Sequence, residues 1–168
     1  MTHTPARKST LPDNSESATL PALNRTLTYR LHLLHKLSDH ASQGAYVAET
    51  GMTLSDGRCL ATVGAFEPLS VNDLARLANL NKGQASRAAQ SLVEQGVLLK
   101  RDHPEDGRGV VLTLTERGRQ SWHKTMALIN RRNEEIFGCL SPLEQSQLSE
   151  LFDRLIAHSV NDAGRSAD

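Results

Sequence analysis

The sequence predicts a mainly α-helical protein with one small β-hairpin, and three observations lead to that prediction. Hydrophobic residues make up 38% of the 168-residue chain and aromatic residues only 4%, so the core must come from Leu, Val and Ala, as in helical proteins. Apolar residues recur at helical spacings over most of residues 20–160. Two short apolar stretches, 97–101 and 109–114, interrupt this pattern and flank a polar loop that contains Asp106-Gly107.

The first part of the chain divides into a tail and a long helix. Residues 1–19 are rich in Ser, Thr and Pro and are expected to form a disordered N-terminal arm. From residue 20 to about 48 the spacing predicts a helix, and its apolar stripe includes Leu20, Leu23, Leu27, Leu31 and Leu34. Such a long stripe needs a partner, and a second copy of the chain is the simplest one.

Three short helices are expected next, and each begins with a capping box, in which a polar first residue and an acidic or amide side chain three positions later satisfy free N–H groups. The pairs are Thr53 with Asp56, Ser70 with Asp73, and Asn81 with Gln84. The last of these helices has small and apolar residues on one side, and Gly96 ends it. With the hairpin that follows, these elements predict a winged helix-turn-helix lobe over residues 52–115.

Helical segments flank this lobe on both sides. Residues 20–50 and 116–160 are expected to form a dimerisation lobe, and Ser141 with Glu144 gives the last helix a capping box. Residues 161–168 are polar and are expected to fray.

These motifs resemble the MarR family of bacterial transcriptional regulators. The resemblance rests on Met52-Thr53-Leu54, on residues 69–101, on the wing sequence PEDGRGVVLTLT and on Glu116-Arg117-Gly118. It covers residues 20–160 and implies a homodimer that binds a pseudo-palindromic operator, most simply as a repressor. Gly57 stands where relatives carry a bulky aromatic residue, which is expected to open space beside the second helix.

The helix from residue 81 to 95 is the expected reader of double-stranded DNA. Arg87 suits guanine and Gln84 suits adenine, while Lys82 suits phosphate and Arg108, in the wing, suits a narrow minor groove. The net charge of the chain is zero, so a local basic patch must attract DNA. The full set of candidates is Ser70, Asn72, Asn81, Lys82, Gly83, Gln84, Ser86, Arg87, Gln90 and Arg108.

A control site is expected on the first two helices. The resemblance implies a small aromatic carboxylate effector, of the benzoate, salicylate or hydroxynicotinate type, that releases the repressor from DNA. The candidate effector-binding residues are Tyr29, Arg30, His35, Gly57 and Arg58. Arg30 is expected to clamp the carboxylate and Tyr29 or His35 to meet a ring hydroxyl, while Gly57 and Arg58 complete the site. A zinc-type regulatory site on His32, His35 and a carboxylate remains an alternative, as does a solvated face that binds nothing.

Several other classes of protein are not expected. The sequence has no catalytic motif such as G-x-S-x-G, HExxH or a phosphate loop, and it shows no cofactor signature. It also has no apolar run that could cross a membrane and no signal peptide, so we expect a cytoplasmic protein. Cys59 and Cys139 are expected to be buried thiols. A winged helix used only for protein contacts is the remaining alternative.

Overall fold

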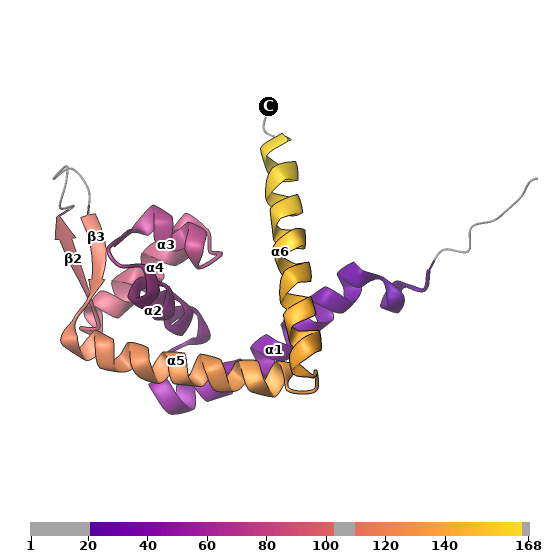
Figure 1. Cartoon of the computed structure of the whole chain (residues 1–168). Coiled ribbons are helices and arrows are strands. Elements are labelled where there is room, and N and C mark those ends of the chain that lie inside the picture. The colour runs from indigo at the N-terminus through magenta and orange to yellow at the C-terminus, as the bar shows by residue number, and fades with distance from the viewer. Residues whose placement is uncertain (1–20, 103–109, 166–168) are drawn as a thin grey trace, which may run out of the picture. The chain divides into compact units, whose positions relative to one another are not determined.

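A computed structural model describes residues 21–102 and 110–165, and it divides the chain into two compact units, Met1–His35 and Lys36–Asp168. The first unit holds a 3-10 turn, η1 (Leu23–Arg25), and the start of helix α1 (Leu27–Thr50). The second unit holds the rest of α1 and all later elements. Figure 1 traces them in chain order, and the expected disordered arm, residues 1–19, lies outside the described residues.

The expected fold class, mainly α with a small sheet, is confirmed. After α1 come the elements α2 (Leu54–Phe66), β1 (Leu69–Ser70), α3 (Val71–Leu77), α4 (Lys82–Glu94), β2 (Leu98–Asp102), β3 (Val110–Leu114), α5 (Glu116–Phe137) and α6 (Pro142–Arg165). Two helix boundaries differ from those expected by more than two residues. The first long helix begins at Leu27 rather than at residue 20, and α6 continues to Arg165, beyond the expected start of the frayed tail.

The wing hairpin carries a third strand that the sequence does not predict. The sheet has the antiparallel order β1-β3-β2, with Leu69 opposite Leu112 and Leu98 opposite Leu114. Because β1 contains only two residues, it shows no alternation of apolar and polar side chains that could reveal it.

The expected N-caps form at α2, α3, α4 and α6, but the complete capping box, with bonds in both directions, is seen at α4 and α6, whereas α2 and α3 show the bond to the N-cap side chain alone. The Thr53 and Ser70 hydroxyls accept the backbone N–H of Asp56 and Asp73, at 3.0 and 3.1 Å. At the start of α6, the Ser141 hydroxyl accepts the Glu144 N–H at 3.4 Å, and the Glu144 carboxylate accepts the Ser141 N–H at 2.8 Å. These local bonds fix where the helices start, and Gly96, with φ +70°, supplies the left-handed residue that follows α4.

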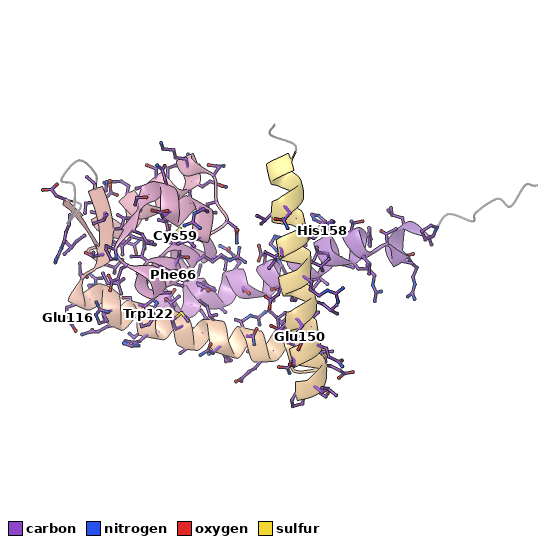
Figure 2. The ribbon with its side chains drawn as sticks, turned by 45° about the horizontal axis from the view of Figure 1, so that its top comes forward. Cys59, Phe66, Glu116, Trp122, Glu150 and His158 are labelled. Atoms are coloured by element: carbon purple, nitrogen blue, oxygen red, sulfur yellow. The ribbon has the colours of Figure 1, made fainter. Side chains whose placement is uncertain are left out.

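One main core lies beneath α2, α3, α4 and the sheet. Its fully buried side chains include Leu60, Leu74, Leu92, Leu98 and Leu112. A smaller core of Tyr46, Leu54 and Leu128 joins α1, α2 and α5. Figure 2 shows Cys59 inside the lobe formed by the main core.

Three close approaches fasten α5 to the lobe. A Cβ built on Gly118 would lie under 3.0 Å from the Val97 carbonyl, and one on Gly64 would collide with the Trp122 ring. The Trp122 Nε1–H also donates to the Ala61 carbonyl at 3.3 Å, so the first half of α5 packs on α2 and on Val97, the residue before β2.

Each unit leaves large apolar side chains exposed. In the first unit these are Leu23, Leu27, Leu31 and Leu34, which lie at helical spacing. On α6 they are Leu143, Leu151, Leu155, Ile156 and Val160. No helix within residues 21–102 and 110–165 is long and apolar enough to cross a membrane.

Candidate nucleic-acid interface and ligand cavity

Helix α4 divides cleanly into an inner and an outer side, as its sequence predicts. Ala85, Ala88, Ala89 and Leu92 are buried against the main core. Small inner side chains let the helix lie close to the lobe. The outer side chains are all exposed, and they are Lys82, Gln84, Ser86, Arg87 and Gln90.

Arg87 is the outer side chain best placed to meet a base. Within the described part of the chain its guanidinium makes no hydrogen bond or ion pair, so its donors remain available to a base edge. Its Nη1 passes over Gly83, since a Cβ built on Gly83 would lie 3.5 Å from that atom. The same Cβ would lie 3.4 Å from Asn81 Oδ1, which is ordinary contact, so packing within the chain does not require a glycine at this position.

Gln84 and Asn81 are held in the capping box of α4. The Asn81 side chain accepts the Gln84 N–H at 2.9 Å, and Gln84 Oε1 accepts the Asn81 N–H at 3.0 Å. A two-bond contact between Gln84 and adenine would use both ends of its amide, so this bond must open first. The structure therefore gives Gln84 a structural bond that competes with base reading.

Gln90 is likewise engaged, in a chain of three side chains that the sequence does not reveal. Lys100 Nζ on β2 donates to Gln90 Oε1 at 2.8 Å, and Gln90 Nε2 donates to Glu94 at 2.8 Å. These bonds link α4 to the wing strand. Lys100 and Arg101 of β2 are also exposed and add positive charge to that of α4. Glu94 is the acidic residue of α4.

The remaining DNA candidates lie in different surroundings. The Ser70 hydroxyl is used in the cap of α3, where it donates to Asp73 Oδ2 at 2.7 Å. That bond, and then the Arg76 guanidinium, hold the pKa of the Asp73 carboxyl below its usual value. Asn72 is exposed on the first turn of α3. Arg108 lies outside the described residues.

A cavity of about 280 Å³ lies between α1, α2 and α5 within the second unit. Its apolar lining comes from Leu54, Ile129, Ile136 and Phe137. Its polar lining is Ser38, Ser42, Tyr46, Arg58, Arg132 and Asn133. An apolar pocket with a few convergent polar groups is the usual form of a small-molecule site.

The space expected beside Gly57 is not open. A Cβ built on Gly57 would lie under 3.0 Å from Cε1 and Cδ1 of Tyr46, so the Tyr46 ring fills that space from α1. The expectation of an open space is therefore wrong, because the sequence cannot show a side chain that arrives from another helix. Burial raises the pKa of the Tyr46 phenol, and the positive charge of Arg58 lowers it by less.

Arg58 lines the cavity, as expected of an effector-binding residue. Its Nη2 donates to Asp39 Oδ1 at 2.5 Å, an ion pair that joins α2 to α1. The other candidates, Tyr29, Arg30 and His35, belong to the first unit, where all three side chains are exposed.

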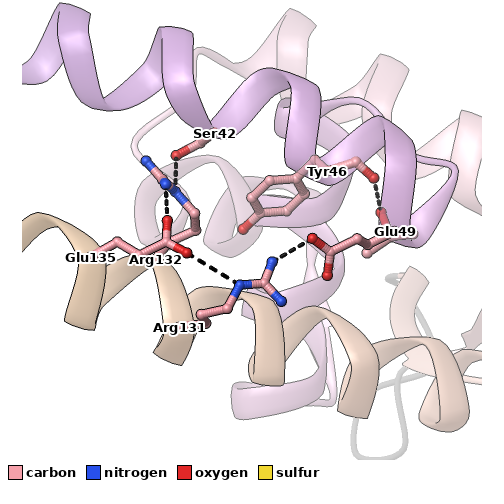
Figure 3. Close-up of polar contacts among 7 residues, drawn as sticks. Ser42, Tyr46, Glu49, Arg131, Arg132 and Glu135 are labelled. Carbon is pink, nitrogen blue, oxygen red and sulfur yellow. Dashed lines mark hydrogen bonds and ion pairs between the residues drawn. The ribbon is translucent and has the colours of Figure 1, made fainter.

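A second arginine in the cavity, Arg132, is absent from the sequence prediction. Figure 3 shows it between α1 and α5, where its Nε donates to the Ser42 hydroxyl at 3.3 Å and its Nη1 bonds Glu135. The neighbouring Arg131 bonds Glu49 of α1. The Arg132 side chain is 16% exposed, so its charge faces the cavity in partly desolvated surroundings.

The structure does not support a metal or redox site in the described residues. Residues 21–102 and 110–165 contain no group of three or more His, Cys, Asp or Glu side chains that could hold a metal ion. Cys59 is buried, and burial raises the pKa of its thiol to about 11, which disfavours the reactive thiolate. The expectation that Cys139 is buried is wrong, because it is exposed in the turn after α5.

Comparison with known proteins agrees with this architecture. A model described as MarR family matches residues 50–109. A curated relative, the HTH-type transcriptional regulator BilQ of Clostridium symbiosum, is 28% identical over 93 residues, which cover 55% of this chain and 65% of the relative, just under two thirds of its length.

Solved structures share the fold. A MarR family transcriptional regulator from Silicibacter pomeroyi has a TM-score of 0.74 at 22% identity, covering 91% of this chain and 99% of that one. Bordetella bronchiseptica BpsR, whose DNA binding is regulated by 6-hydroxynicotinic acid, has a TM-score of 0.71 at 17% identity, covering 80% of this chain and 95% of that one. The MarR family model matches residues 50–109, and the chain shares its fold with these solved structures, which agrees with the resemblance that its motifs carry.

Proposed function

We propose that the protein is a DNA-binding transcriptional regulator that uses α4 as its recognition helix. The observation that carries this proposal is the outer side of α4, where Lys82, Ser86 and Arg87 stand exposed above a row of buried alanines. Cations and short polar side chains on a closely seated helix suit the edges and phosphates of a major groove. Lys100 and Arg101 add positive charge on the neighbouring strand.

The regulator acts as a homodimer on a pseudo-palindromic operator, most simply as a cytoplasmic repressor. The support is the exposed apolar side chains in the first unit and on α6, which a second copy would cover. Two-fold symmetry then presents two recognition helices to half-sites about 34 Å apart.

A gel shift on DNA from upstream of the coding region tests this function. We expect a specific complex that resists excess random DNA and weakens as salt rises, because bound cations release counterions from DNA. Equal affinity for the upstream fragment and for random DNA would contradict a sequence-specific regulator. Sedimentation of the complex tests the expected stoichiometry of two chains per operator.

The effector is a small aromatic carboxylate bound in the cavity between α1, α2 and α5. Arg58 and Arg132 bring two guanidinium groups to this cavity, and Leu54, Ile129 and Ile136 offer apolar surface to a ring. Guanidinium groups bind carboxylates through paired hydrogen bonds. The regulation of BpsR by an aromatic acid supports this choice of ligand class.

Calorimetry with benzoate, salicylate and hydroxynicotinate, with and without operator DNA, tests the effector. If the acid lowers the affinity of the protein for DNA, then DNA must lower the affinity of the protein for the acid by the same factor, because linkage is reciprocal. The same affinity in both conditions would contradict an inducing role. Arg58→Met is expected to abolish binding of all three acids.

Other functions fit the observations less well. A winged helix used only for protein contacts would be expected to show an apolar or acidic outer side on α4, whereas this side carries cations and neutral polar groups. A zinc-responsive regulator would need ligands around His32 and His35, and the described residues hold no such group. The match to regulators rather than enzymes argues against a catalytic function.

A further inference from the structure

A second cavity, of about 240 Å³, lies between α5 and α6. Its lining residues lie one turn apart on each helix, so both helices present one side to it. They are Asn133 and Phe137 of α5 and Gln145, Leu148, Ser149 and Phe152 of α6. Three of these side chains, Phe137, Leu148 and Phe152, are apolar and half-buried.

Hydrogen bonds from Gln145, which lines this second cavity, tie α6 to the end of α5 and to the turn between the helices. Gln145 Nε2 donates to the carbonyl of Phe137 at 3.3 Å and to that of Leu140 at 3.0 Å. The Phe137 carbonyl is at the last residue of α5, and the Leu140 carbonyl lies in the turn that leads to α6. The bonds hold the first turn of α6 against the last turn of α5.

The two cavities adjoin, because Asn133 and Phe137 line both of them. On one side of this pair lie the guanidinium groups of Arg58 and Arg132. On the other side lies the apolar surface of α6, with Phe152. The combined space therefore runs from a cationic end to an apolar end, along α5.

Resting on the proposed effector site, we infer that the effector is an elongated acid that occupies both cavities. Its carboxylate meets Arg58 and Arg132, and an aromatic or alkyl extension of several carbon atoms passes Phe137 and contacts Phe152. Small-molecule pockets usually enclose roughly 300–1,000 Å³. Each cavity alone is smaller than that range, whereas the two together fall inside it. A single-ring acid such as benzoate would fill only the cationic end.

A homologous series of acids tests this inference by calorimetry. The series is benzoate, phenylacetate, phenylpropanoate and phenylbutanoate, all with one carboxylate and one ring. We expect affinity to rise about fourfold per methylene, the factor that corresponds to about 0.8 kcal/mol of apolar burial, until the chain reaches α6. An affinity that stays constant or falls along the series would overturn the inference.

Variants on α6 separate a ligand contact from a structural effect. Phe152→Ala should lower the affinity for phenylbutanoate by about tenfold or more and leave the affinity for benzoate unchanged. The milder Phe152→Leu should recover part of that loss. Gln147→Ala, on an exposed polar residue of the same helix that lines neither cavity, is the matched control and should leave the affinity for both acids unchanged. If Phe152→Ala lowers the affinity for both acids equally, the inference is contradicted.

The outcomes also distinguish this inference from the proposed function. Benzoate that binds through Arg58, with no gain along the series, keeps the proposed effector site and overturns only the elongated ligand. Failure of every acid to bind overturns both. Sedimentation shows whether Phe152→Ala dissociates the dimer. If it does, and the ratio of the two acid affinities stays unchanged, the second cavity is a contact with another copy of the chain.

Discussion

The aromatic ring of Tyr46 lies directly against the backbone of Gly57, which lets α1 and α2 approach closely. A Cβ on Gly57 would come under 3.0 Å from the ring, and Tyr46 is only 3% exposed. The glycine thus admits an aromatic side chain from a neighbouring helix, in the wall of the proposed effector cavity.

Gly57→Ala is expected to destabilise the protein by about 1–3 kcal/mol, because the added methyl group forces the ring of Tyr46 aside. Urea unfolding measures the change in free energy. Gly44→Ala is the matched control on α1, where a Cβ would meet nothing within 4 Å. That variant should gain up to about 1 kcal/mol from helix propensity. Equal stabilisation by both substitutions would show that the contact between Tyr46 and Gly57 is loose.

Asp39→Asn is expected to tighten binding of benzoate, because Asp39 already occupies the Arg58 guanidinium that the ligand carboxylate needs. Both side chains are partly exposed, so the gain should stay within about fivefold, the equivalent of a surface ion pair of up to about 1 kcal/mol. Calorimetry measures the affinity. Glu49→Gln is the control, since it removes an acid that pairs with Arg131 and does not line the cavity. A weaker complex in Asp39→Asn would contradict competition for Arg58.

Gly83→Ala is expected to raise the stability of the protein and to lower its affinity for DNA. A Cβ there would meet only ordinary contacts, so α4 should become more stable by about 1 kcal/mol. The added methyl group lies in the first turn of α4, and if that turn approaches a DNA phosphate as proposed, binding to DNA should weaken. Thermal unfolding and fluorescence anisotropy measure the two effects. Unchanged affinity would mean that this turn does not approach the DNA closely.

Tyr46 should titrate above pH 10.0, since burial raises the pKa of its phenol. The phenol is neutral below its pKa, so a folded-state pKa above the unfolded value favours folding at lower pH, and this stability is lost as pH rises above 10.0. Phenolate absorbance in Tyr29→Phe reports Tyr46 alone, because the chain has 2 tyrosines. A midpoint below 10.0 would show that the positive charge of Arg58 outweighs burial.

The sequence predicts those features that depend on neighbours within a few residues. The N-caps at Thr53, Ser70 and Asn81 and the two sides of α4 follow from spacings of three and four residues, and all are confirmed, with the full capping box at Asn81. Features that join distant segments could not be predicted in this way. The ring of Tyr46 at Gly57, and Arg132 beside Ser42, appear only when α1, α2 and α5 come together.

Hydrogen bonds within the protein compete with contacts to bases, and the sequence of α4 does not reveal them. Gln84 and Gln90 have the residue type and spacing of base readers, yet both amides are used within the protein, one in the helix cap and one between Lys100 and Glu94. Residue type alone cannot tell a side chain that is available to DNA from one that is already bonded. Arg87 meets both conditions in the described structure.

The most direct test of the account is the effect of Arg87→Ala on operator and random DNA, measured by anisotropy at several salt concentrations. If Arg87 bonds a base as proposed, operator affinity should fall by about 1–3 kcal/mol, with a much smaller loss on random DNA. Lys82→Ala, which removes a proposed phosphate contact, should weaken binding to both DNAs equally and reduce the salt dependence. Equal loss on both DNAs for Arg87→Ala would contradict the assignment of α4 as the helix that reads sequence.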